Sequence, residues 1–162
     1  MDCNRFDIKR LLRILSFTLL LELGMHWLSQ RIIVSINTMT SLPQAAFLVL
    51  KGKPVLRGEY VAFNPPPNPL YTSQKPFIKI VGGVPGDRVS AKNSQFYING
   101  KFIGLAKPIS SKGYPLKTGP TGVLPKDEYF VYAPNPNSFD SRYEAMGWIN
   151  KSRFIGRAYP VF

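Results

Sequence analysis

The stretch 76-PFIKIVGGVPGDRV-89 decides the fold, because it joins an apolar strand to a turn rich in glycine and proline. On a strand, Phe77 and Val81 would share the face of Lys79, and the two intervening isoleucines would lie on the other face. Two interpretations are open at this point. The lysine either protects an edge strand from wrong pairing, or sits in apolar surroundings that make it a base.

Short apolar runs bounded by turn residues dominate the chain beyond residue 36, which predicts strands. The 15 prolines and 13 glycines in 162 residues also favour short elements. Asn99 and Gly100 separate two such runs and predict a two-residue hairpin. We therefore expect one mainly β domain over residues 37–162, with a loop or small insertion at 105–124. The expected strands are 46–50, 59–63, 77–81, 95–98 and 128–133.

One apolar segment near the N-terminus predicts a membrane-spanning helix. Residues 1–13 contain four basic residues, and residues 14–28 are almost continuously apolar. That order predicts a cytoplasmic N-terminus and an exported remainder. Fifteen helical residues reach only about 22 Å, so the anchor would extend over 14–36 to cross a ~30 Å hydrocarbon core. A cleaved signal peptide is the alternative, but no small-x-small site follows the apolar run.

Histidine and cysteine occur once each, which limits the available chemistry. Cys3 and His26 lie before or inside the predicted span, so the exported domain can hold no Ser-His-Asp or Cys-His site. A base in that domain must be a carboxylate, a tyrosine or a lysine. A serine or threonine nucleophile could come from 35-SINTMTSLP-43, which also fits an ordinary polar linker. Glu22 shares a helix face with His26, and we interpret that pair as a local accommodation rather than a functional pathway.

The remaining composition argues against cofactors and nucleic acid. The acidic residues beyond the span lack metal-ligand spacing, and no phosphate loop or dinucleotide fingerprint occurs. The net charge of +12 comes largely from scattered lysines without a nucleic-acid-binding motif. We therefore expect no cofactor, no metal and no nucleic-acid partner, and we expect the membrane to be one partner.

Three separated segments together resemble the type I signal peptidase superfamily. Ser41-Leu42-Pro43 resembles its nucleophile segment, in the Ser-x-Pro form of the TraF-like conjugative-transfer peptidases. Residues 77–89 are similar to the segment in which the catalytic lysine precedes a Gly-x-Pro-Gly-Asp turn. The stretch 137-NSFDSRYEAMGWI-149 resembles the C-terminal Asn-Ser-x-Asp-Ser-Arg-Tyr box. The resemblance implies a signal-peptidase-like β fold with one N-terminal transmembrane helix.

The resemblance also implies a role for each matching residue. Ser41 would be the nucleophile and Lys79 its general base. Ser138 would orient the lysine, and Asp140 and Arg142 would form a supporting ion pair. In the ordinary signal peptidases two residues commonly separate the serine from the proline, a spacing that would place Thr40 at the nucleophile position.

Two positions depart from the family pattern. Ala45 stands where glycine is common, and Met39 stands where a small hydroxyl residue often stabilises the oxyanion. The oxyanion candidates are then the backbone N–H of Ser41, with Thr38 or Thr40 as helpers.

The function implied is a serine endopeptidase with a Ser/Lys dyad, anchored once in the bacterial inner membrane with its catalytic domain in the periplasm. It would process a membrane-tethered precursor, a pilin for conjugative transfer, by hydrolysis or by cyclisation, alongside other transfer components. A general type I signal peptidase is the alternative among enzymes. A non-catalytic, membrane-anchored assembly subunit is the alternative from another class.

Overall fold

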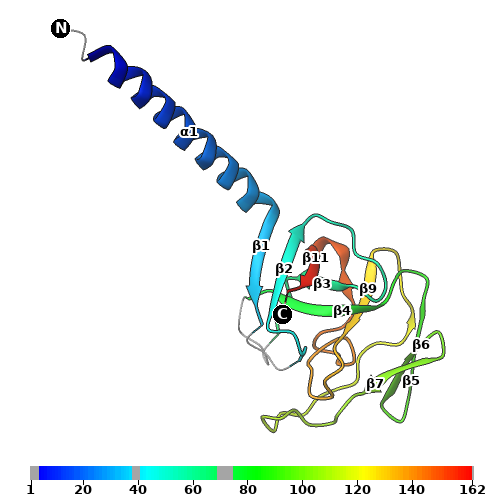
Figure 1. Ribbon diagram of the computed structural model, residues 1–162. Helices are drawn as coiled ribbons and strands as arrows, with labels where there is room; N and C mark the ends of the chain where they lie inside the picture. Colours follow the sequence, from blue (N-terminus) through cyan, green and yellow to red (C-terminus); the bar gives the residue numbers. More distant parts are fainter. Residues whose placement is uncertain (1–3, 38–40, 69–74, 162) are drawn as a thin grey trace.

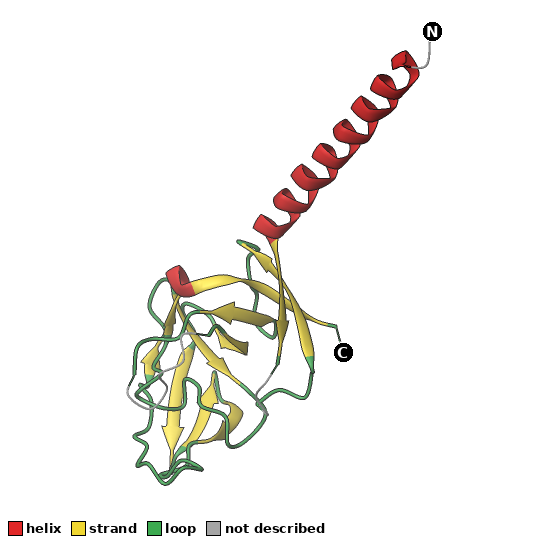
Figure 2. Ribbon diagram, turned by 90° about the vertical axis from the view of Figure 1, so that its left-hand side faces the viewer, coloured by secondary structure: helices red, strands yellow, loops and turns green. Residues whose placement is uncertain are grey.

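A long N-terminal helix projects from a β domain in the computed structural model, which describes residues 4–37, 41–68 and 75–161 (Figure 1). Helix α1 spans Asn4–Arg31 and leads directly into strand β1, Ile32–Ile36. The described remainder is built from strands and loops with one short 3₁₀-helix, η1, at Lys151–Arg153 (Figure 2). The prediction of a mainly β fold with one apolar N-terminal helix is confirmed.

Two sheets form the domain. The larger has seven strands in the order β1-β2-β11-β3-β4-β9-β10, and the smaller has four in the order β7-β6-β5-β8. All pairings within both sheets are antiparallel. The larger sheet adds β2 (Ala46–Lys51), β3 (Tyr60–Phe63), β4 (Phe77–Gly83), β9 (Glu128–Tyr132), β10 (Ile149–Asn150) and β11 (Phe154–Pro160). The smaller sheet contains β5 (Arg88–Lys92), β6 (Gln95–Ile98), β7 (Lys101–Leu105) and β8 (Gly122–Val123).

The predicted helical anchor over 14–36 is wrong at its C-terminal end. The helix ends at Arg31, and the next five residues pair with β2, with Ile32 opposite Leu50 and Ile36 opposite Ala46. Three consecutive β-branched residues begin this strand, and such residues favour a pleated surface over a helix. The 24 residues Ile8–Arg31 are still long and apolar enough to cross a membrane, at about 36 Å of helix.

The sequence pattern predicted four of the seven strands of the larger sheet and one strand of the smaller sheet. Strands β2, β3, β4, β6 and β9 lie on the five predicted runs. Asn99 and Gly100 form the hairpin between β6 and β7, both with positive φ (49° and 82°), as a type I′ turn requires. The segment 106–121, within the predicted loop, contains only two isolated bridges.

A turn centred on one carboxylate holds the end of β4. Gly86 has φ of 90°, which favours glycine. Asp87 accepts hydrogen bonds from the Val84 N–H (2.8 Å), the Asn99 amide (2.8 Å) and the Arg57 guanidinium (2.6 Å). Burial alone would raise the pKa of Asp87, but these donors outweigh it and lower that pKa. The turn thereby joins the end of β4 to the smaller sheet.

Candidate active site

Lys79 lies in the interior of the larger sheet. Strand β4 pairs with β3 on one side, where Lys79 faces Val61, and with β9 on the other. The interpretation of Lys79 as an edge-strand charge is therefore wrong. Its face of β4 is buried, with Phe77 and Val81 on either side, and Lys79 itself is only 3% exposed.

Burial lowers the pKa of Lys79 from 10.5 to about 8. Asp140 opposes this change by its negative charge, and Arg142 adds to it by its positive charge. The Nζ atom of Lys79 donates a 2.7 Å hydrogen bond to Oγ of buried Ser138. The amine therefore has a fixed partner and a weakened hold on its third proton.

Ser41 and Lys79 line the same cavity, although 37 residues separate them in the chain. The cavity has a volume of about 320 Å³ and is open to solvent. Residues 33–37 contribute one part of its lining and residues 75–79 another. Apolar side chains dominate this lining, including Val49, Ala62 and Ile155. A molecule that filled the cavity would displace water from both groups.

Asn37 fixes the segment that carries Ser41, a role that the sequence analysis missed. Its Nδ2 donates to the carbonyl oxygens of Leu42 (3.0 Å) and Gln44 (2.8 Å), and its backbone N–H donates to Ala45 O (2.8 Å). These contacts join the end of β1 to both sides of the turn after Ser41. An asparagine followed by a hydroxyl-rich turn was the available signal, because Asn side chains commonly bond nearby backbone groups. Thr38, Met39 and Thr40 lie outside the described residues.

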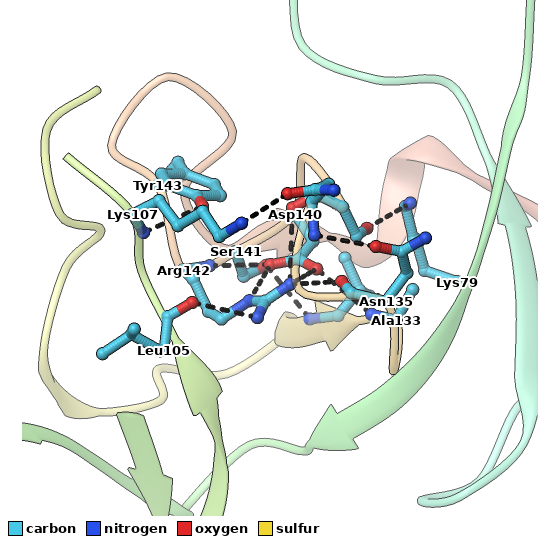
Figure 3. A network of polar contacts seen from close by, with 12 residues as sticks. Lys79, Leu105, Lys107, Ala133, Asn135, Asp140, Ser141, Arg142 and Tyr143 are labelled. Atoms are coloured by element: carbon cyan, nitrogen blue, oxygen red, sulfur yellow. Dashed lines mark hydrogen bonds and ion pairs between the residues drawn. The ribbon is translucent and has the colours of Figure 1, made fainter. Parts of the chain in front are cut away.

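Asp140 and Arg142 form a buried ion pair within the network of polar contacts that Figure 3 shows. Arg142 donates from Nε to Oδ1 of Asp140 and from Nη2 to Oδ2, both at 2.8 Å, and the two residues are 2% and 0% exposed. Asp140 also accepts from the Ala133 N–H at 3.1 Å, and Arg142 donates to the carbonyl oxygens of Leu105 (3.1 Å) and Ser138 (3.3 Å). This network fixes the loop that presents Ser138 to the lysine.

The electrostatics of the ion pair match its geometry. Burial would lower the pKa of Arg142, but the hydrogen bonds and charge of Asp140 outweigh that effect and raise it. A Cβ at Gly104 would lie 2.7 Å from Nη1 of Arg142, so the guanidinium packs where only glycine leaves room.

Within the described residues, no group of three or more His, Cys, Asp or Glu side chains is placed to hold a metal ion. The side chains that the structure brings together are therefore hydroxyls, one amine and one ion pair. Such a set can move a proton and present a nucleophile.

The comparisons with known proteins identify the family. The family model described as "Signal peptidase, peptidase S26" matches residues 8–162, nearly the whole chain. The chain therefore belongs to the S26 signal peptidase family, a family of serine peptidases.

Individual relatives are similar over part of their length. The "probable signal peptidase I-2" of Synechocystis is 34% identical over 111 residues, covering 65% of this chain and 47% of that protein. A "signal peptidase I" of Bacillus amyloliquefaciens is 37% identical over 115 residues, covering 65% of this chain and 57% of that protein. The chain thus spans about half the length of these curated relatives. The crystal structure of a signal peptidase I from Enterococcus faecalis matches with a TM-score of 0.44 and 24% identity, covering 65% of this chain and 97% of that one.

Replacing Asp140 with Asn should destabilise the domain, because Arg142 would keep its charge without a buried partner. Breaking one side of such a pair costs about 3–5 kcal/mol of unfolding free energy. Urea denaturation of the full chain in detergent, followed by near-UV circular dichroism, measures the loss. The double variant Asp140→Asn/Arg142→Met should recover part of it, since neither charge remains.

Glu144→Gln is the matched control. It removes the exposed carboxylate that lies 3.6 Å from Lys117, so its effect on stability should be too small to resolve. Equal losses in Asp140→Asn and Glu144→Gln would show that the buried pair does not support this loop.

Proposed function

We propose that this chain is a membrane-anchored serine endopeptidase that removes leader peptides from membrane-tethered precursor proteins. The observation that supports this most directly is a buried lysine of lowered pKa, hydrogen-bonded to Ser138, in the same cavity as Ser41. The relatives named signal peptidase I support the same activity. The proposal assigns the nucleophile to Ser41 and the general base to Lys79.

The reaction begins when neutral Lys79 accepts the hydroxyl proton of Ser41. Ser41 Oγ attacks the scissile carbonyl carbon, and the tetrahedral intermediate collapses as Lys79 returns the proton to the leaving amine. Water, deprotonated by the same amine, then attacks the acyl carbon, and the bond to Ser41 Oγ breaks as Lys79 returns the proton to that oxygen. With a pKa of about 8, roughly one-tenth of Lys79 is neutral at pH 7, and exclusion of water by a bound substrate would increase that share.

The supporting roles follow from the contacts. Ser138 holds the amine of Lys79, and the pair of Asp140 and Arg142 holds the loop of Ser138. For the oxyanion we propose the backbone N–H of Ser41, with the hydroxyls of Thr38 or Thr40 as further donors.

The anchor would bring this site to its substrate. Residues of β1 line the cavity, and β1 follows α1 without a linker, so the site would lie close to the membrane surface. Four basic residues at the N-terminal end of α1 favour a cytoplasmic N-terminus. We therefore propose a single-pass protein of the bacterial inner membrane with a periplasmic β domain. Precursors held by an apolar leader would present their cleavage point at this level.

A narrower candidate is processing of a pilin precursor for conjugative transfer. The feature that favours it is Pro43, which follows Ser41 in the Ser-x-Pro form. Mass spectrometry of a processed pilin distinguishes the outcomes, since a cyclised product is lighter than the linear one by one water. The relatives cited above carry the name signal peptidase and support the broader activity.

Processing of a membrane-tethered precursor should depend on two side chains. Ser41→Ala and Lys79→Met should each lower the rate by at least about a thousandfold, because members of a nucleophile–base unit are not individually dispensable. Lys79→Arg should be equally inactive, since arginine does not lose its proton. Thr40→Ala should stay measurably more active than Ser41→Ala, because Thr40 would supply at most an oxyanion donor if Ser41 is the nucleophile. The rate is measured in proteoliposomes by gel analysis of precursor and product.

The exposed residues Ser90 and Lys92 on β5 provide matched controls, as Ser90→Ala and Lys92→Met. Both should process the precursor at the wild-type rate. Full processing by Ser41→Ala would refute the nucleophile assignment. A folded wild-type chain that cleaves no tethered precursor would favour the non-catalytic assembly subunit.

Asn37 should act as a positioning residue for Ser41. Asn37→Asp keeps the size of the side chain but replaces the amide donor with a carboxylate oxygen. That oxygen cannot donate to the two carbonyl oxygens and would repel them, so the turn should shift. Loss of these hydrogen bonds should lower kcat about tenfold and leave KM within about twofold. Asn68→Asp is the control, because Asn68 donates to a carbonyl in a different loop. A change in KM alone would contradict a role in placing the nucleophile.

A further inference from the structure

The structure has a second cavity, and one hydrogen bond links a residue of its lining to a residue of the proposed catalytic cavity. It has a volume of about 260 Å³ and lies between the segment after β7 and the loop that carries Ser138. Ser138 lines this distal cavity, and its Oγ accepts a hydrogen bond from Nζ of Lys79, which lines the first cavity. One buried hydrogen-bonded pair, Lys79 and Ser138, therefore links the linings of the two cavities.

The distal cavity combines an apolar wall with two cationic groups. Phe139 and Tyr143 stack on one another at 5.9 Å, and Ile109 and Tyr114 are more than half exposed although they line the cavity. Lys107 and Lys112 are the charged residues in its lining, which contains no carboxylate.

Neighbouring carboxylates do not offset this charge. Asp140 is buried and paired with Arg142, and exposed Glu144 lies 3.6 Å from Lys117. Lys107 is oriented by a 2.6 Å hydrogen bond to Oδ1 of Asn137, which uses one of its three protons. The cavity therefore suits a peptide segment with apolar and acidic side chains.

The position of the distal cavity relative to α1 indicates which part of a substrate it would hold. Figures 1 and 2 place α1 at one end of the molecule and the segment after β7 at the opposite end of the domain. Strands β1 and β4, whose residues line the same cavity as Ser41, lie between these two ends. A precursor whose leader lies in the same membrane as α1 would therefore extend its mature part toward the distal cavity.

From these observations we infer that the distal cavity binds the mature side of the precursor, just beyond the scissile bond, and that it favours acidic residues there. This inference rests on the proposed function and adds a substrate preference to it. Lys107 and Lys112 would be specificity-determining residues that contact the acidic side chains of the substrate. The apolar wall would contact the substrate side chains that lie between those acidic residues.

The test uses full-length protein in zwitterionic proteoliposomes and precursors that are identical through the leader and the first mature residue. Mature positions two to five carry a pair of Asp, Ser or Lys residues. The value of kcat/KM should fall in that order by about fivefold in total, the size typical of partly exposed charge pairs, and less at high salt. Lys112→Glu should reverse the order. Lys92→Glu makes the same change of charge on an exposed residue outside the cavity and should leave the order intact.

A second readout separates the inference from the proposed function. Fluorescence anisotropy measures binding of a labelled mature-side hexapeptide that contains the Asp pair, without any cleavage. Binding that Lys112→Glu weakens about fivefold, in a protein that cleaves no precursor, would support the acidic-peptide site and refute the peptidase. Cleavage that is indifferent to mature-side charge would overturn the inference and leave the peptidase standing.

Two further results would also overturn the inference. If Lys112→Glu changes the preference for leader-side charge only, the cavity holds the opposite part of the substrate. If Lys112→Glu changes only the oligomeric state seen by light scattering, the cavity binds a second copy of the chain.

Discussion

Burial of one lysine amine inside the larger sheet is the constraint on which the rest of the site depends. Lowering the pKa of Lys79 from 10.5 to about 8 corresponds to roughly 3 kcal/mol against the charged form. The fold must supply that free energy whenever the amine is protonated. Between pH 8 and 10.5 the unfolded chain binds more protons than the folded one, so stability from this group rises with pH across that window.

A chain of polar contacts holds the buried amine of Lys79 in place. Ser138 accepts from the amine, Arg142 donates to the carbonyl oxygen of Ser138, and Asp140 neutralises the guanidinium. Asp140 also supplies negative charge that partly raises the pKa of Lys79, so the ion pair limits how neutral the lysine becomes. The general base proposed for Lys79 would thus depend on burial balanced against one nearby carboxylate.

Local sequence rules predicted the elements whose determinants are local. The alternation in β4 and the Asn99-Gly100 turn are examples, because side-chain periodicity and positive φ depend on neighbouring residues. Strand β11 was not predicted, since it contains glycine, arginine and proline and is fixed by pairing with β2 and β3, which lie about 90 to 110 residues away. The end of α1 was misplaced because the apolar run continues into β1, and only pairing with β2 separates strand from helix.

The candidate site was predictable in part for the same reason. Resemblance to a known family, not spacing, selected Ser41 and Lys79, because strand order alone brings them to one cavity. Whether Lys79 lay on an edge or in the interior also depended on the pairing of β4 with both β3 and β9. The most direct measurement is an NMR titration of lysine side chains labelled at Cε in the full-length protein. One resonance, absent from Lys79→Met, should titrate with a midpoint near pH 8, whereas a midpoint for Lys79 near its ordinary 10.5 would contradict the account.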